Sequence, residues 1–289
     1  MRISGILSDY DGTLCPTSYI RSKESNIPKE LENILWDIAD TIPVCIVSSK
    51  DFNFLHNKTR FANVISSILG IETCVLKQHE RTMRETINSK ECQEFRCIRN
   101  SYLSIDYTTL EQNSQLLSLL AKEIALRFDK ISIERKFTID NKILAGITID
   151  WRNVDDWQSF KVKSEPQLRK TITEKQRELE QQVKPDSIHI QTYATHPFID
   201  IYAAKCDKGM AYESILSLMT NSERKEHRIM YLGDSENDNP AFRKADVSIG
   251  VRSDERLNPY LDCRYTLNFG KLVGFLKKLR NDNFVFSGV

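Results

Sequence analysis

Two clusters of acidic residues follow apolar runs near opposite ends of the chain. Residues Asp9 to Thr13 (DYDGT) come directly after the run Ile3 to Ser8, and Gly233 to Asp238 (GDSEND) come after Ile229 to Leu232. Carboxylate oxygens are the ligands that hard cations such as Mg²⁺ prefer. A solvated turn rich in Asp and Gly would explain either cluster alone. Two such clusters, each after an apolar run, predict a Mg²⁺ site.

Further polar residues fit a site for a phosphoryl group. Ser48 and Ser49 end the apolar run that begins at Val44 and precede an expected helix, where hydroxyl and backbone N–H groups favour an anion. Helix capping explains a serine there equally well. Lys208 begins a later expected helix and could neutralise phosphate charge. Lys208 is one of 41 basic residues, so its type alone is not informative. Its position after Ser48 and before the second acidic cluster is what suggests a role at the site.

Alternating strands and helices must position these residues. A strand at Ile3 to Ser8, a helix opened by Pro28, a strand at Val44 to Ser48 and a helix over 49–61 form a β-α-β-α series. The final third resumes this series from Lys208 onward. The pattern predicts an α/β fold with a parallel sheet covered by helices. Because the carboxyl ends of parallel strands face the ligand crevice, both acidic clusters should project into it.

The middle of the chain follows a different pattern. Residues 131–137 and 143–151 alternate apolar and polar positions around Asp140-Asn141, which is typical of an antiparallel hairpin. Residues 188–193 and 198–203 suggest a second strand pair. The charged segment 155–183 has a helical composition, and we expect Pro166 to start or kink a helix rather than lie within one.

We therefore expect an antiparallel α+β insert between two halves of one parallel sheet. The insert is placed at residues 78–204, and the catalytic core at residues 1–77 and 205–289.

Composition narrows the class of partner. The 289 residues include 41 Lys plus Arg and 40 Asp plus Glu, so the net charge of +1 gives no global field that favours nucleic acid or an anionic membrane. Seven cysteines without a C-x-x-C pair suggest free thiols and a reducing compartment. With no signal peptide or membrane span expected, we predict a soluble cytoplasmic protein with a small partner.

In its motifs and their order, the chain resembles the haloacid dehalogenase-like (HAD) phosphohydrolases. The four motifs of that family appear here in the same order, as Asp9-x-Asp11-Gly-Thr13, Ser48, Lys208 and Gly233-Asp234-x-x-Asn237-Asp238. The segments that carry them cover a little over half of the chain. The resemblance implies a Rossmann-like HAD core with an inserted C2-type α+β cap domain.

The resemblance also implies a role for each matching residue. Asp9 would be the nucleophile, Asp11 the general acid and base, Ser48 a phosphoryl ligand and Lys208 the charge clamp. Magnesium would be held by Asp9, the backbone carbonyl of Asp11, and Asp234, and Asp238 would hold either Lys208 or the metal shell. The neighbouring polar residues expected to contact substrate are Thr13, Ser49 and Asn237.

The insert resembles the cap of trehalose-6-phosphate phosphatases. Ile133-Glu134-x-Lys136 and Asp150-Trp151-Arg152 are similar to the Glu-x-Lys and His-Tyr-Arg segments of that subfamily, and Leu69-Gly70-Ile71-Glu72 also has a counterpart there. The resemblance implies that Glu134 and Lys136 contact sugar hydroxyls and that Arg152 also binds substrate. Asp150 and Trp151 depart from the expected His and Tyr, and Ser49-Lys50 stands where Gly-Arg is usual.

Together these features predict a Mg²⁺-dependent phosphomonoesterase that acts on a small sugar phosphate through a phosphoaspartyl intermediate. Trehalose 6-phosphate is the named candidate, and sucrose phosphate, mannosyl phosphoglycerate and phosphoglycolate are rivals within the same reaction. A phosphosugar mutase similar to phosphomannomutase is an alternative, because related mutases share the core and a similar cap. A non-catalytic sugar-phosphate sensor is a third interpretation, but a pure binding module has no use for both Asp9 and Asp11.

Overall fold

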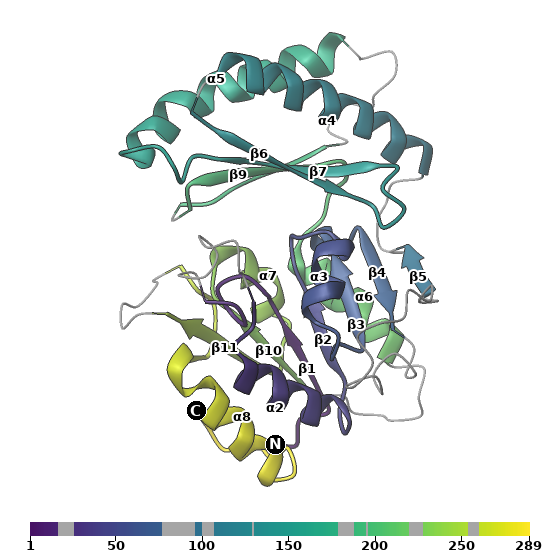
Figure 1. The fold of residues 1–289 in the computed structure, drawn as a ribbon, viewed down its shortest axis with the longest axis vertical. Coiled ribbons are helices and arrows are strands. Elements are labelled where there is room, and N and C mark those ends of the chain that lie inside the picture. Colours follow the sequence, from purple (N-terminus) through teal and green to yellow (C-terminus); the bar gives the residue numbers. More distant parts are fainter. Residues whose placement is uncertain are drawn as a thin grey trace. The chain divides into compact units, whose positions relative to one another are not determined.

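The computed structural model describes residues 1–16, 26–76, 96–99, 107–128, 130–178, 188–194, 196–219, 228–253 and 260–289. The chain divides into two compact units, which we call the core unit (Met1–Asn100 and Asp207–Val289) and the cap unit (Ser101–Cys206). Figure 1 shows the elements of each.

The core unit contains one sheet with helices on both faces. Its elements are β1 (Gly5–Ser8), α2 (Lys29–Ala39), β2 (Val44–Val47), α3 (Phe52–Lys58), β3 (Val64–Ser67), the 3₁₀ helix η1 (Ile68–Gly70), β4 (Glu72–Val75), β5 (Arg96–Arg99), α6 (Lys208–Met219), β10 (Ile229–Gly233), the 3₁₀ helix η3 (Glu236–Asp238), α7 (Asn239–Phe242), β11 (Val247–Arg252), β12 (Tyr265–Asn268) and α8 (Phe269–Asn281).

The strand order of this sheet is β12-β11-β10-β1-β2-β3-β4-β5. The strands from β12 to β3 are parallel, and β4 and β5 extend the sheet in antiparallel pairs. From β1 the chain continues to β2 on one side, whereas from β10 it continues to β11 on the other. The sheet therefore has a topological switch point between β1 and β10, which is where open α/β sheets bind ligands. The predicted α/β class is confirmed.

Apolar residues at helical spacing hold α2 against the sheet. Leu31, Ile34, Leu35 and Ile38 are all buried, as their spacing predicts, and α2 also packs against α8 (Figure 1). A separate buried cluster joins α6 and α7 to the strands, with Tyr231 of β10 among its members. Burial on both faces explains why the central strands consist almost entirely of apolar residues.

The cap unit has the predicted antiparallel α+β architecture. Its elements are α4 (Tyr107–Arg127), β6 (Ser132–Phe137), β7 (Leu144–Asp150), α5 (Trp157–Glu178), β8 (His189–Thr192) and β9 (Phe198–Tyr202), with strand order β6-β7-β9-β8. Both helices cover one face of this sheet (Figure 1). Both predicted hairpin pairings are confirmed.

Pro166 lies inside α5, so the prediction that it would not lie within a helix was wrong. Proline removes the hydrogen bond to the carbonyl four residues earlier. Pro166 and Val162 are both exposed, which leaves that carbonyl accessible to water. The helix therefore tolerates the proline on its solvent side.

The boundary expected between core and cap falls on residues outside the described ranges. We placed it at residue 78, whereas residues 77–95 are not described. Beyond them, β5 pairs with β4 in the core sheet, and the compact cap unit begins at Ser101. Among the helices that the structure describes, none is both long and apolar enough to cross a membrane.

Candidate active site

The first acidic cluster lies where β1 ends at the switch point. Asp9 directly follows the last residue of the strand, and its backbone N–H donates to the carbonyl of Leu232 in β10 (2.9 Å). Gly12 turns the chain with a φ of 81°, and a Cβ there would lie 1.9 Å from Oδ2 of Asp234. Glycine is thus needed both for the turn and for the approach of Asp234. Thr13 donates its hydroxyl to Oδ1 of Asp234 (3.3 Å).

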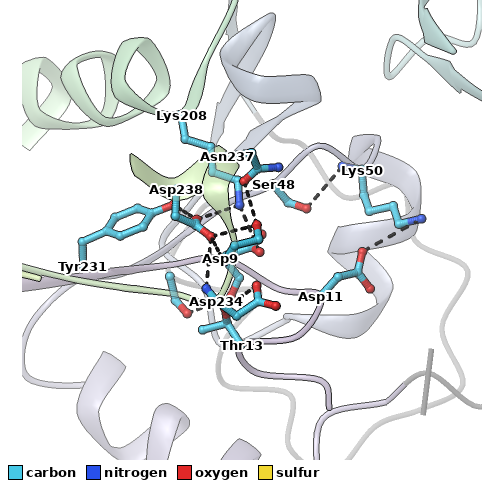
Figure 2. Close-up of polar contacts among 12 residues, drawn as sticks. Asp9, Asp11, Thr13, Ser48, Lys50, Lys208, Tyr231, Asp234, Asn237 and Asp238 are labelled. Carbon is cyan, nitrogen blue, oxygen red and sulfur yellow. Dashed lines mark hydrogen bonds and ion pairs between the residues drawn. The ribbon is translucent and has the colours of Figure 1, made fainter. Parts of the chain in front are cut away.

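Lys208 joins the two acidic clusters from the first residue of α6. Its side chain is 1% exposed, and Nζ lies 3.0 Å from Oδ2 of Asp9 and 2.7 Å from Oδ1 of Asp238 (Figure 2). Burial would lower the pKa of Lys208, but Asp238 and Asp9 more than offset it and raise the pKa above its usual range. Lys208 therefore remains a cation between two carboxylates.

Asp238 is fully buried and accepts hydrogen bonds on both carboxylate oxygens. Oδ1 accepts from Lys208 and from the hydroxyl of Tyr231 (2.8 Å). Oδ2 accepts from the backbone N–H groups of Asp234 (3.1 Å) and Ser235 (3.0 Å) and from the Ser235 hydroxyl (3.3 Å). A Cβ on Gly233 would lie 2.4 Å from Cγ of Asp238, so glycine makes room for this carboxylate. These five donors fix Asp238 in one orientation.

Three carboxylates face one another with a single ammonium group among them. Ligand oxygens of Asp9, Asp234 and Asp238 all lie within 4.8 Å of one another. Burial is the main reason that the pKa of Asp9 is raised to about 7, and the Asp238 and Asp11 carboxylates raise it further against the opposing effect of Lys208. Burial raises the pKa of Asp234 well above its usual range, and the Asp9 and Asp238 carboxylates raise it further.

This excess of buried negative charge indicates a place for a cation. All of the donors are carboxylate oxygens, which suit a hard divalent ion such as Mg²⁺ rather than a thiolate- or imidazole-binding metal. The Asp9, Asp234 and Asp238 cluster could therefore bind a metal ion.

The predicted phosphoryl ligand Ser48 directly follows β2, the strand next to β1. It is 1% exposed, and its hydroxyl accepts a hydrogen bond from the backbone N–H of Lys50 (3.2 Å). Ser49 is half-buried beside it. The Lys50 ammonium lies 3.9 Å from Oδ2 of Asp11 (Figure 2). It also lies 5.5 Å from the centre of the Phe54 ring. This arrangement places a cation beside the expected general acid.

The second half of the fourth motif lies in η3. Asn237 is 8% exposed, and its side-chain oxygen accepts from the Ser235 hydroxyl (3.4 Å). The core unit thus brings the residues of the first, third and fourth motifs together at the switch point, and places Ser48 and Ser49 at the end of the adjacent strand.

The three cap residues expected to bind sugar differ in their surroundings. Glu134 is exposed on β6, whereas Lys136 is 2% exposed and pairs with Asp200 of β9 (3.1 Å). Arg152 pairs with Asp150 (2.5 Å). No local pattern indicated a buried partner for Lys136, because Asp200 lies 64 residues further along the chain.

Asp200 is the centre of a buried polar network in the cap sheet. Besides Lys136 it accepts from the hydroxyls of Thr148 and Tyr193, the latter at 2.8 Å. Burial would raise the pKa of Asp200, but Lys136 and these hydroxyls hold it below its usual range. The network therefore keeps Asp200 ionised and paired.

Sequence reasoning missed several polar residues that contact the predicted site residues, among them Ser235 beside Asp238 and Asp200 beside Lys136. Tyr231 reaches Asp238, and Lys50 reaches Asp11. Tyr231 carried a usable signal, because a tyrosine in a strand buried on both faces needs a partner for its hydroxyl. The signal for Lys50 was its place after the second motif, where Ser49-Lys50 stands in place of the usual Gly-Arg.

Comparisons with known proteins agree with this geometry. A model of the family described as haloacid dehalogenase-like hydrolase matches residues 6–257. A search of curated proteins gave no match.

Solved structures with a similar fold include three phosphatase-related proteins. A trehalose-6-phosphate phosphatase related protein is 17% identical, with a TM-score of 0.57 over 96% of this chain and 97% of that one. The C-terminal domain of trehalose-6-phosphate phosphatase from C. albicans is 18% identical, with a TM-score of 0.57 over 96% and 93% of the two chains. A sugar phosphatase of HAD subclass IIB is 11% identical, with a TM-score of 0.50 over 98% and 100%.

At these identities the likeness establishes the fold, with its inserted cap of the C2 type. The family match extends from β1 past the second acidic cluster and so includes every residue that meets at the switch point. The chain belongs to the haloacid dehalogenase-like hydrolases and is an enzyme of that superfamily.

Proposed function

We propose that this enzyme is a Mg²⁺-dependent phosphomonoesterase that hydrolyses a small sugar phosphate through a phosphoaspartyl intermediate on Asp9. The position of the Asp9 carboxylate carries this proposal. It lies 3.0 Å from the Lys208 ammonium, within the carboxylate cluster, at the switch point of the sheet. A carboxylate so placed can attack phosphorus while neighbouring positive charge screens the repulsion between the two anions.

In the first step, a carboxylate oxygen of Asp9 forms a bond to phosphorus and the ester P–O bond breaks. Asp11 gives a proton to the departing alcohol oxygen, and Lys208 offsets charge on the phosphoryl oxygens. Ser48 donates its hydroxyl to one of those oxygens. In the second step, Asp11 takes a proton from water as that water attacks phosphorus, which releases phosphate and restores Asp9.

Asp9, Asp234 and the backbone carbonyl of Asp11 would hold Mg²⁺. When bound, the ion supplies the positive charge that lets a carboxylate approach a phosphate dianion. Asp238 contributes through Lys208, because its two oxygens already accept five hydrogen bonds from the chain.

The substrate proposal rests on the face of the cap sheet away from the helices. Strand register places Glu134 in one row with Thr148, Asp200 and Gln191. Exposed Glu134 can accept hydrogen bonds from sugar hydroxyls. We assign a supporting role to Lys136, two residues further along β6, because its ammonium already pairs with Asp200. The similar structures named as trehalose-6-phosphate and sugar phosphatases support a sugar phosphate, with trehalose 6-phosphate as the first candidate.

A substrate panel tests the reaction and the substrate class. We expect purified enzyme with Mg²⁺ to release phosphate from trehalose 6-phosphate faster than from sucrose 6-phosphate, mannosyl phosphoglycerate, phosphoglycolate, glucose 6-phosphate or p-nitrophenyl phosphate. Faster phosphate release from another panel member would support the proposed hydrolysis but exclude trehalose 6-phosphate as the preferred substrate. Phosphoryl transfer that requires a sugar bisphosphate activator, without phosphate release, would favour a mutase.

Replacing Glu134 with alanine should impair sugar recognition but not the chemical step. Loss of a charged acceptor for sugar hydroxyls costs about 1.5–3 kcal/mol, so KM for the sugar phosphate should rise by about 10- to 150-fold. Kinetics with p-nitrophenyl phosphate, which has no sugar, should stay within about twofold. The matched control is Glu174→Ala on α5, where a partly exposed glutamate pairs with Lys170 (3.8 Å). Equal effects of Glu134→Ala on both substrates would remove Glu134 from the specificity role.

A further inference from the structure

We propose that Tyr231 is a positioning residue for the reaction, which it serves by fixing the carboxylate that holds Lys208. This inference rests on the proposed phosphatase function and extends it to a residue outside the four motifs. Tyr231 lies on β10, two residues before the glycine that opens the last motif.

The contact that suggests this role is short and fully buried. The Tyr231 hydroxyl donates to Oδ1 of Asp238 at 2.8 Å, and the same oxygen accepts from Lys208 at 2.7 Å. Tyr231 and Asp238 are both 0% exposed, so water does not compete for either bond. Figure 2 shows the phenol, the carboxylate and the ammonium in sequence, with Asp9 beyond Lys208.

The tyrosine ring is itself held in place. It packs edge-on against Phe242 of α7, with centroids 5.5 Å apart and planes at 87°, inside the cluster that joins α6 and α7 to the sheet. A buried ring with such contacts keeps one rotamer. The hydroxyl is therefore a fixed point from which the position of Asp238 is set.

The two oxygens of Asp238 are restrained differently. Oδ2 has three donors from the Asp234–Ser235 segment, whereas among the described residues Oδ1 accepts from Tyr231 and from the flexible end of the Lys208 side chain. Without the phenol, the carboxylate can pivot about its Oδ2 side, and Lys208 can shift between Asp238 and Asp9. A displaced ammonium would stabilise charge on the transferring phosphoryl group less well, and small displacements in an active site are costly.

Replacing Tyr231 with phenylalanine tests this role. We expect kcat for the preferred substrate to fall about tenfold, with KM within about twofold, because the lost positioning acts in the transition state. Binding of orthovanadate, a phosphoryl transition-state mimic, should weaken by a similar factor in a thermal-shift titration with Mg²⁺. The matched control is Tyr212→Phe, since Tyr212 is a 3% exposed tyrosine of the same cluster. That variant should retain wild-type kcat and vanadate affinity.

Combining Tyr231→Phe with Lys208→Arg shows whether Tyr231 acts through Lys208. In Lys208→Arg enzyme, adding Tyr231→Phe should lower kcat by less than about twofold, because residues that act as one unit are not additive. A further tenfold loss in that background, or equal kcat losses in the Tyr231→Phe and Tyr212→Phe enzymes, would overturn the proposal.

The vanadate titration separates failure of this inference from failure of the proposed function. If wild-type enzyme turns over no phosphate ester but binds vanadate, the phosphatase proposal fails and the Tyr231→Phe affinity still tests the positioning role. If wild-type enzyme is active and Tyr231→Phe equals it in kcat and vanadate affinity, only the Tyr231 inference is wrong. If wild-type enzyme neither turns over esters nor binds vanadate, both proposals are wrong.

Discussion

Replacing Asp9 with asparagine should abolish phosphate release and leave the folded protein at least as stable as wild type. An amide is too weak a nucleophile to form the phosphoaspartyl intermediate, so residual turnover should be below about 1% of wild type. Phosphate release under Mg²⁺ with the preferred substrate measures this directly. Residual activity of more than a few per cent in purified enzyme would exclude Asp9 as the nucleophile.

The Asp9→Asn protein should be at least as stable as wild type because the charge of Asp9 is buried. Its pKa in the folded protein is raised from 3.8 to about 7, mainly by burial. The folded state therefore binds this proton more tightly than the unfolded state, and the resulting stability is lost as pH rises between these two values. In metal-free enzyme near pH 8, ionised Asp9 thus costs stability that a neutral asparagine would not. Asparagine can still accept a hydrogen bond from Lys208, which lies 3.0 Å from Asp9.

Thermal melts without metal provide the check. We expect Tm of the Asp9→Asn enzyme to be equal to or a few degrees above wild type near pH 8, with a smaller difference near pH 5. The control is Asp37→Asn on α2, where a partly exposed aspartate lies 3.4 Å from Arg280. That change should leave both activity and Tm close to wild type. A lower Tm for Asp9→Asn near pH 8 would mean that the Lys208 ion pair outweighs the cost of burial.

Local patterns were sufficient to predict the parts of the fold that position Asp9. The apolar runs before each acidic cluster are β1 and β10, and their adjacency follows from a parallel sheet with a switch point. The spacing of Leu31, Ile34, Leu35 and Ile38 predicted the buried face of α2. These features depend on short-range periodicity, which a single sequence records directly.

Features set by long-range pairing could not be read in this way. The antiparallel pairing of β5 with β4 depends on a partner that no local pattern identifies. Lys136 has the sequence of a solvated strand position, yet it is buried because Asp200 meets it across the cap sheet. The buried position of Tyr231 indicates that its hydroxyl needs a partner, but the strand pattern does not identify Asp238 as that partner. In each case the decisive partner is a tertiary contact.

Removing divalent metal should abolish phosphate release and lower thermal stability. Ligand oxygens of three carboxylates lie within 4.8 Å of one another and are balanced only in part by Lys208. A bound Mg²⁺ relieves this repulsion, and binding to the folded state alone contributes about 2.7 kcal/mol at a hundredfold excess over Kd. We therefore expect EDTA-treated enzyme to be inactive, and Tm to rise by several degrees on adding Mg²⁺.

The same binding should strengthen with pH, because the ligands must lose their protons. The pKa of Asp9 is about 7 without metal, so Mg²⁺ binding releases a proton below that pH and is opposed there. The Mg²⁺-induced rise in Tm should accordingly be larger near pH 8 than near pH 6. Asp234→Asn should lose most of this rise, along with activity, whereas Asp37→Asn should retain both. A Tm rise in Asp234→Asn equal to that of wild type would place the metal elsewhere, since ligand oxygens of Asp234 and Asp9 lie within 4.8 Å of each other.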